Sequence, residues 1–271
     1  MRIRDSAIII TGASSGIGEA AALAFAGKGA RLALCARRLD RLQAVAEACR
    51  LAGSPEVTTR RVDVRRREQA HSFVAAAIRD FERIDALVNN AGFGWHGRFQ
   101  EMPPEKVISM LETNIAGLVW TTQAALPHML ARREGVILNV ASIVGFRANP
   151  YSALYSATKH AVVGMSHALR GELSGSGVKV SVVYPASTRT EFFTDFEHPV
   201  NPGPMWSSRS VARLIVRTVR RPRRDVIVFP WRLVQAAEPL LGGFGDHAAG
   251  EMMRRASPDL RGPGELPPDI T

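Results

Sequence analysis

The glycine-rich turn at residues 11–18 constrains the fold of this chain more than any other feature; its sequence is T-G-A-S-S-G-I-G. An apolar run, residues 7–10, precedes the turn, and an alanine-rich run, residues 19–28, follows it. These runs predict a buried parallel strand and a helix. A glycine-rich turn in this setting can bind the pyrophosphate of a dinucleotide, because glycine lets the backbone approach phosphates at the helix N-terminus. The G-x-x-x-G-x-G spacing is a variant of the common G-x-G-x-x-G fingerprint.

A serine, a tyrosine and a lysine form the second informative pattern. Tyr155 and Lys159 are four residues apart, so a helix would place them on one face. Ser142 follows the apolar run 136–141, which predicts a strand whose C-terminal end presents the serine to that helix. A cation near the phenol is expected to lower its pKa from the reference value of about 10, and the serine could donate a hydrogen bond to a carbonyl oxygen. The pattern indicates proton transfer to a carbonyl, although Y-x-x-x-K alone occurs by chance in many helices.

Together and in this order, the two motifs resemble those of the short-chain dehydrogenase/reductase family. The resemblance covers roughly residues 5–230. Further matches are Asn89-Asn90-Ala91-Gly92 after the run 86–88, Asp63-Val64 after the third expected strand, and Pro185 after the sixth. One departure is Ala186, because the family usually has glycine after this proline. Its methyl group makes a positive φ unfavourable there.

The resemblance implies a role for each matching residue. Tyr155 would donate the proton, Ser142 would orient the carbonyl, Lys159 would hold the ribose hydroxyls of the cofactor, and Asn114 would anchor a water relay. No metal is expected. The residues expected to contact the cofactor are Gly12, Ser14, Ser15, Gly16, Ile17, Gly18, Arg37, Arg38, Asp63, Val64, Asn90, Ala91, Gly92, Tyr155, Lys159, Pro185, Thr188 and Thr190.

The second expected strand, residues 31–36, informs the choice of cofactor. NAD enzymes of this fold use an acidic residue near this point to hold the ribose 2′-hydroxyl, whereas an arginine suits the 2′-phosphate of NADP. Here Ala36 stands at the acid's expected place, and Arg37 and Arg38 follow it. The sequence therefore favours NADP(H) over NAD(H), although arginine is abundant throughout the chain.

Substrate specificity is expected to come from loops at the C-terminal ends of the strands. The aromatic residues of these loops are Trp95, Phe146, Tyr151, Phe192, Phe193 and Trp206. This lining is largely apolar, so it favours an apolar ketone, aldehyde or secondary alcohol as the substrate. The loop 191–206 holds three prolines and is a candidate lid.

The whole chain is expected to form one Rossmann-like, doubly wound α/β domain, because strand-like and helix-like segments alternate along residues 1–230. Expected strands are 6–11, 31–36, 56–62, 85–89, 135–141, 178–184 and 225–229. Expected helices are 16–28, 40–52, 66–81, 104–133, 152–174 and 208–221, with Pro127 kinking or shortening the fourth.

The remaining residues are harder to interpret. Residues 231–255 are expected to pack over the cleft or on a neighbouring subunit, and the apolar part, 231–244, is interrupted by Pro239 and two glycines. A peripheral membrane contact through 231–244 is the less favoured interpretation. Residues 256–271 are rich in proline and glycine and are expected to be disordered.

The net charge of +10 invites comparison with nucleic-acid-binding proteins. The arginine clusters at 65–67 and 220–224 lack interleaved aromatic residues and a known reader motif, so no nucleic-acid partner is expected. Cys35 and Cys49 are expected to be free, buried thiols, in keeping with a cytoplasmic protein. No signal peptide and no membrane-spanning segment are expected.

The sequence thus predicts an NADP(H)-dependent oxidoreductase that interconverts a carbonyl and an alcohol on a largely apolar small molecule. Two alternatives stay open: an NAD-linked catabolic alcohol dehydrogenase, and a non-enzymatic NADP-sensing or scaffold protein of the same fold. The family resemblance also implies a homodimer or homotetramer.

Overall fold

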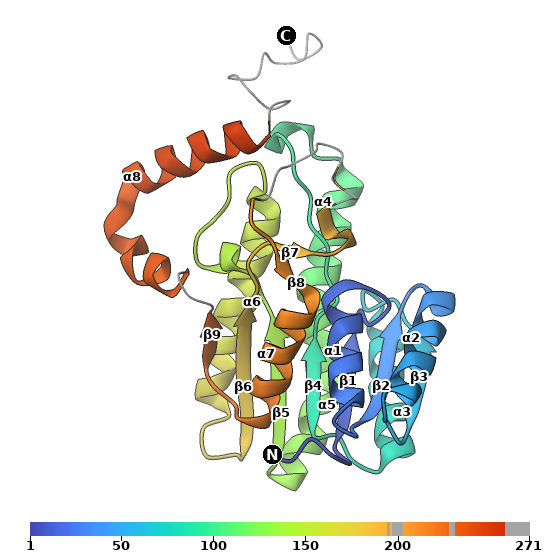
Figure 1. Cartoon of the computed structure of the whole chain (residues 1–271). Coiled ribbons are helices and arrows are strands. Elements are labelled where there is room, and N and C mark those ends of the chain that lie inside the picture. Colours follow the sequence, from blue (N-terminus) through green and yellow to red (C-terminus); the bar gives the residue numbers. More distant parts are fainter. Residues whose placement is uncertain (194–195, 197–202, 228–230, 258–271) are drawn as a thin grey trace.

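The computed structural model describes residues 1–193, 196, 203–227 and 231–257 and confirms the predicted doubly wound α/β fold (Figure 1). Seven parallel strands form one sheet in the order β3-β2-β1-β4-β5-β6-β9. The strands are β1 (Ala7–Thr11), β2 (Arg31–Ala36), β3 (Val57–Arg61), β4 (Ala86–Asn89), β5 (Gly135–Val140), β6 (Val178–Tyr184) and β9 (Asp225–Ile227). The sequence did not predict two further short strands, β7 (Thr188–Arg189) and β8 (Trp206–Ser207), which pair with each other.

Helices cover both faces of the sheet, as Figure 1 shows. One face carries α1 (Gly16–Ala26), α2 (Leu39–Leu51) and α7 (Ser208–Arg220), and the other carries α3 (Arg67–Phe81), α5 (Gly117–Arg132) and α6 (Ala153–Glu172). Side chains of β1 alternate between the two cores, so that Ile8 and Ile10 pack under the first set and Ile9 under the second. Because both faces are buried, the strand is apolar throughout.

The two cysteines are free, as the sequence predicted. Cys35 lies on β2 and Cys49 on α2, and both are fully buried. Burial raises the pKa of the Cys49 thiol to about 12, so both groups behave as small apolar side chains.

The predicted helix 104–133 is interrupted, but not at Pro127. It begins as α4 (Pro104–Leu111), passes through a π-helical turn (Glu112–Ala116), and continues as α5 through Pro127 to Arg132. Asn114 lies in the π-helical turn, where its side chain is held by three hydrogen bonds to neighbouring segments. Such turns are frequent at functional sites because the inserted residue points differently from its neighbours.

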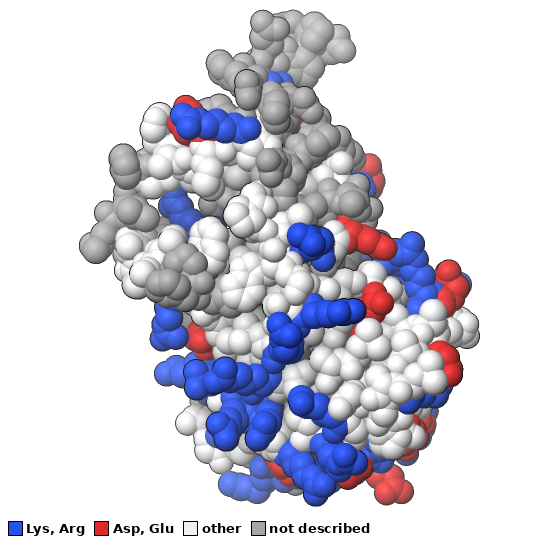
Figure 2. Space-filling model, viewed as in Figure 1, with Lys and Arg blue, Asp and Glu red and all other residues white. Residues whose placement is uncertain are grey.

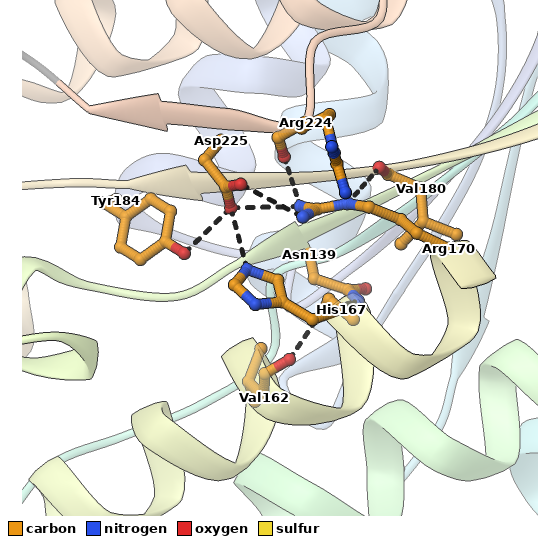
Figure 3. A network of polar contacts seen from close by, with 9 residues as sticks. Asn139, Val162, His167, Arg170, Val180, Tyr184, Arg224 and Asp225 are labelled. Carbon is orange, nitrogen blue, oxygen red and sulfur yellow. Dashed lines mark hydrogen bonds and ion pairs between the residues drawn. The ribbon is translucent and has the colours of Figure 1, made fainter.

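The edge strand β9 is held to the sheet by a polar network around Asp225 (Figure 3). The Asp225 carboxylate accepts two hydrogen bonds of 3.0 Å from Arg170, one of 3.0 Å from the Tyr184 hydroxyl and one of 3.2 Å from His167. Burial alone would raise the pKa of Asp225, but the hydrogen bonds and charge of Arg170 outweigh it and hold this pKa below its usual range. The network joins α6, which carries Tyr155, to the end of the sheet.

The segment after β9 was expected to be interrupted at Pro239 and two glycines, but the structure shows one continuous helix. Helix α8 (Trp231–Ala256) runs through Pro239 and the two glycines, and in Figure 1 it starts near β9 and curves over the upper end of the molecule. Good helix formers such as alanine, leucine, methionine and glutamate before and after this point favour a continuous helix. The described part of the chain holds no helix long and apolar enough to cross a membrane. Residues 258–271, most of the expected disordered tail, lie outside the described residues.

The strand order places a topological switch point between β1 and β4. The chain winds outward in one direction from β1 to β3 and in the other from β4 to β9, so the loops that follow β1 and β4 separate there. Open α/β sheets bind ligands in the crevice that this separation creates at the C-terminal ends of the strands.

Candidate active site

The glycine-rich turn after β1 is tightly packed against its neighbours. Gly12 and Gly16 have positive φ values of 65° and 61°, which disfavour residues with a side chain. A Cβ on Gly18 would overlap the Gly12 carbonyl oxygen and lie 2.6 Å from Asn90 Nδ2. A Cβ on Gly12 would lie 2.8 Å from the α carbon of Ala91. The turn therefore requires glycine at these positions, and it precedes the N-terminus of α1, which is where a dinucleotide pyrophosphate binds in this kind of site.

The N-N-A-G segment after β4 supports this turn directly. Asn90 Nδ2 donates hydrogen bonds of 3.1 Å to the carbonyls of Thr11 and Gly12. The backbone N–H groups of Asn90 and Ala91 both donate to the Thr11 hydroxyl at 3.0 Å. The structure thus brings together two motifs that lie almost eighty residues apart in the sequence, at the switch point of the sheet.

The arginines after β2 lie beside the same turn. Arg38 donates a hydrogen bond of 2.7 Å to the Ser15 hydroxyl, and it also forms an ion pair of 3.0 Å with Glu191. Glu191 pairs with Arg41 as well, at 2.6 Å, and these two guanidiniums hold the pKa of its carboxyl below the usual range. Arg37 is exposed and close enough to contribute to the lowered pKa of Asp63. No local pattern in the sequence signals the role of Glu191, because this residue contacts Arg38 across 153 residues.

Asp63 and Val64 follow β3 at the outer side of this region. The Asp63 carboxylate is bound by the Arg65 guanidinium at 2.6 Å, and the hydrogen bonds from Arg65 hold the pKa of Asp63 below its usual range. Val64 lies against Gly117 at the start of α5, where a Cβ would come within 2.7 Å of it. Asp63 therefore follows β3 as one partner of an ion pair, and Val64 packs in the core.

The segment after β6 closes the cleft from the other side. The Pro185 carbonyl accepts a hydrogen bond of 3.0 Å from Ile143 N, which joins this segment to the loop of Ser142. Ala186 does not have a positive φ, and its carbonyl accepts a hydrogen bond of 2.7 Å from the Thr188 hydroxyl. Thr190 packs against Gly16, where a Cβ would lie 3.2 Å from the threonine methyl group. The substitution of glycine by alanine is therefore accommodated without backbone strain.

Ser142, Tyr155 and Lys159 converge as their spacing predicts. Ser142 follows the end of β5, while Tyr155 and Lys159 lie one turn apart on α6. The hydroxyls of Ser142 and Tyr155 are hydrogen-bonded. Lys159 Nζ donates a hydrogen bond of 3.0 Å to the Val140 carbonyl and lies 5.7 Å from the centre of the Tyr155 ring. A hydroxyl, a phenol and an amine thus gather at the C-terminal end of the sheet.

The protonation of this group differs from the expectation in one respect. Burial raises the pKa of Tyr155 above its ordinary value, and only the hydrogen bond from Ser142 opposes the increase. Burial also lowers the pKa of Lys159 to about 8. The lysine was expected to lower the pKa of the phenol, but burial of the phenol dominates and raises its pKa instead.

Asn114 joins this group from the π-helical turn. Its side-chain oxygen accepts a hydrogen bond of 3.0 Å from Phe93 N, and its amide donates to the Phe93 carbonyl at 2.9 Å and to the Thr158 hydroxyl at 3.1 Å. A Cβ on Gly92 would lie 3.0 Å from Asn114 Oδ1 and 3.6 Å from Lys159 Nζ. Asn114 and Lys159 therefore flank the last glycine of the N-N-A-G segment.

The expected pocket residues separate into two groups. Phe192 lies over the catalytic region, with its ring centre 5.2 Å from that of Tyr155, and Trp95 and Tyr151 line a cavity of about 290 Å³ beside the N-terminus of α6. Phe146 instead packs against Tyr184, and Trp206 on β8 is 38% exposed. The side chain of Phe193 lies outside the described residues.

The buried His96 contacts two segments that are distant in the sequence, which the sequence did not predict. One ring nitrogen lies 3.2 Å from the Ser152 hydroxyl at the start of α6, and the other lies 2.8 Å from the Ser257 hydroxyl after α8. The ring also stacks on Phe196, with centres 5.8 Å apart. Helix α8 thereby ends on the substrate side of the cleft, and no local pattern signals a contact across 161 residues.

The glycine-rich turn at the switch point, here called the glycine cradle, lies next to a half-buried serine and tyrosine and a buried lysine, and this arrangement defines a dinucleotide-dependent oxidoreductase. No group of acidic, histidine or cysteine side chains within the described ranges could hold a metal ion. The short chain dehydrogenase family model matches residues 6–201, and the chain belongs to this family. It is an oxidoreductase that uses a nicotinamide cofactor.

Individual proteins resemble the chain over most of its length. It is 37% identical over 240 residues to 11-beta-hydroxysteroid dehydrogenase 1A of Arabidopsis thaliana, which covers 83% of this chain and 68% of that protein. An alcohol dehydrogenase of Thermococcus sibiricus, solved with 5-hydroxy-NADP, superposes with a TM-score of 0.75 at 29% identity, over 83% of this chain and 96% of that one. A 3-ketoacyl-(acyl-carrier-protein) reductase of Brucella melitensis, solved with NADH, gives 0.77 at 27% identity, over 83% and 97%.

Proposed function

We propose that the protein interconverts a carbonyl group and an alcohol on a small, largely apolar molecule, with NADP(H) as the preferred cofactor. The observation that carries the proposal is the convergence of Ser142, Tyr155 and Lys159 beside the glycine cradle. When bound, the nicotinamide cofactor supplies or accepts a hydride. The glycine-rich turn, the N-N-A-G segment and Thr190 are the parts of the chain that would hold it, because they form one packed surface at the switch point.

The side chains of the chain itself would handle the proton. In the reduction direction, the Tyr155 hydroxyl gives its proton to the carbonyl oxygen, and Ser142 donates a hydrogen bond to that oxygen as negative charge develops. Tyr155 is left as a phenolate. Lys159, with a pKa of about 8, is mostly protonated at pH 7 and can stabilise that phenolate. Asn114, on the other side of Gly92, would connect Lys159 with solvent through water.

The apolar nature of the substrate is supported by the rings around Tyr155. Phe192 covers the Tyr155 ring, and Phe196 lies 5.3 Å from Phe192. Trp95 is buried with only 6% of its side chain exposed. The resemblance to a hydroxysteroid dehydrogenase agrees with this lining, since that protein's name indicates an apolar alcohol as its substrate.

A panel of ketones, aldehydes and secondary alcohols, each tested with NADPH and with NADH, tests the reaction directly. The Tyr155→Phe variant should lose at least about a thousandfold in kcat, since proton transfer contributes this much in comparable sites. Its affinity for the cofactor should stay within about threefold, because the hydroxyl is not part of the glycine cradle. Wild-type protein that binds NADPH but turns over no member of the panel would favour the sensor interpretation.

The cofactor preference is a separate question, and NAD(H) is the second candidate. The observation in favour of NAD(H) is the pairing of Glu191 with Arg38 and Arg41. The single Glu191 carboxylate offsets one of the two positive charges of Arg38 and Arg41, so less charge is left to attract a 2′-phosphate. Arg37 and the hydrogen bond from Arg38 to Ser15 support NADP(H). The Arg38→Ala variant should raise KM for NADPH about tenfold or more and leave KM for NADH nearly unchanged. The reason is that the substitution removes a charged hydrogen bond to the 2′-phosphate, a group that NADPH has and NADH lacks. Arg79→Ala, at an exposed position of α3, serves as the control.

A further inference from the structure

Helix α7 and the residues that follow it carry an unusual excess of positive charge. Residues 208–224 include seven arginines and neither aspartate nor glutamate. The arginines are Arg209, Arg213, Arg217, Arg220, Arg221, Arg223 and Arg224, and all seven are exposed. The first four recur every three or four residues, so they share one side of the helix. The other side of α7 is apolar and buried against α1, which fixes the arginines toward solvent.

These arginines differ from those elsewhere in the protein. On other elements, arginine is commonly neutralised by a nearby acid, as in Arg65 with Asp63 at 2.6 Å and Arg170 with Asp225 at 3.0 Å. Within the described ranges, none of the seven arginines at 208–224 forms an ion pair. Their charge is therefore available to a partner, and it adds to a local positive potential.

The N-terminal segment extends the charged surface. Arg2, Arg4 and Lys28 line a hollow of about 600 Å³ together with Arg220, at the C-terminal end of α7. The backbone of this segment is joined to α7 by a hydrogen bond of 2.8 Å from Met1 N to the Arg220 carbonyl. Figure 2 shows the resulting band of lysine and arginine side chains over α7 and below it, with few acidic side chains among them. We call these ten residues the α7 basic face.

We propose that the α7 basic face docks the protein on the surface of an anionic lipid bilayer. Guanidinium groups bind phosphates through paired hydrogen bonds, and lipid headgroups present phosphates in a plane. The face is suited to a plane, because α7 lies flat on the body of the protein and extends for about 20 Å at the rise of an α-helix. Clusters of four to eight cations on a helix are typical of anionic-lipid recognition. Trp206, 38% exposed at the N-terminal end of α7, is of the type that lies at membrane interfaces.

Two other partners fit less well. If a second copy of the chain bound symmetrically through this face, seven unneutralised arginines of one copy would face seven of the other, and the like charges would repel each other. Proteins that read nucleic acids typically add to phosphate contacts a helix in a groove or aromatic rings on which bases stack. No aromatic residue lies among the seven arginines, and the chain shows no known nucleic-acid reader motif.

The test is cosedimentation of the full chain with vesicles of phosphatidylcholine alone and of phosphatidylcholine mixed with phosphatidylserine. We expect binding only to the mixed vesicles, and weakening of that binding by salt. The double variant Arg213→Gln/Arg217→Gln should bind them about thirtyfold more weakly, since each cation near an anionic surface contributes about a fivefold factor. Both side chains are exposed, so the thermal unfolding midpoint should change little.

The matched control is Arg61→Gln/Arg79→Gln, which removes the same charge from exposed positions on β3 and α3. It should retain nearly all of the vesicle binding. Equal losses in the two double variants would show that net charge alone drives the binding and would overturn the proposal. So would an absence of binding by the wild-type protein. Tighter binding to polyuridylate than to the mixed vesicles at the same salt concentration would assign the face to nucleic acid instead.

Discussion

The two sides of the cleft are built from different parts of the protein. On the cofactor side, glycines and backbone groups make the close contacts: Gly18 lies against the Gly12 carbonyl, and Asn90 hydrogen-bonds the backbone of the turn. On the substrate side, the contacts are between aromatic rings that come from distant segments, such as Phe192 on Tyr155 and Phe196 on His96. The comparison suggests that the cofactor side tolerates almost no change, whereas the substrate side can be altered one ring at a time.

The largest effect on cofactor binding is expected from Gly18→Ala. The new methyl group would overlap the Gly12 carbonyl oxygen and crowd Asn90 Nδ2, so the glycine-rich turn must shift. We expect the affinity for NADPH to fall at least about a hundredfold, because the displaced turn could no longer bind the pyrophosphate closely. Fluorescence titration with NADPH measures the change. The finding that Gly18→Ala binds the cofactor normally would remove the contrast between the two sides.

Gly164→Ala is the matched control for this substitution. Gly164 lies in α6, has no positive φ, and has no atom within 4 Å of its Cβ position. The variant should bind NADPH normally and gain about 1 kcal/mol in its free energy of unfolding, because alanine favours the helix.

The same contrast explains which parts of the molecule could be predicted from sequence. The glycine-rich turn and the pair Tyr155 and Lys159 depend on spacings of a few residues, which a strand or a helix converts directly into geometry. The pairing of Glu191 with Arg38 and the contact of His96 with Ser257 join residues more than 150 positions apart. Their positions depend on how whole elements pack, so no local pattern reveals them.

The interruption between α4 and α5 also depends on tertiary contacts that the sequence alone does not reveal. Proline at 127 was the visible breaker, but a proline in a helix removes one backbone donor and α5 continues past it. The π-helical turn at Asn114 arises from tertiary hydrogen bonds to Phe93 and Thr158, which the sequence does not display. Helix α8 was underestimated for a related reason, since helix propensity on either side of Pro239 outweighs the local breakers.

Lys159 lies between the two sides and should show an effect on stability that depends on pH. Its pKa is about 8 in the folded protein, below the ordinary 10.5. Between these values the unfolded chain holds a proton that the folded protein has released, so stability increases with pH across this window, by up to about 1.4 kcal/mol per pH unit. Lys159→Met should abolish this slope and stabilise the protein at pH 7, while turnover is lost. Urea unfolding from pH 7 to 10.5 measures it.

Lys179→Met provides the control for the pH dependence, because Lys179 is exposed on β6. This variant should keep the slope of the wild-type protein. A slope in Lys159→Met as steep as that of the wild type would mean that other groups cause the pH dependence. The position of Lys159 would then impose no cost on folding.

The smallest effect is expected on the substrate side, from Phe192→Ala. The ring of Phe192 contacts Tyr155 and Phe196 but none of the glycines of the cofactor turn. Loss of its apolar area and of one ring pair should raise KM for an apolar ketone about tenfold and change kcat by less than about threefold. KM for NADPH should stay the same. Ile108→Ala, at an exposed position of α4, is the control. A Phe192→Ala variant without measurable turnover would show that the substrate side is as intolerant of change as the glycine cradle, because the ring would then be required to hold Tyr155 in place.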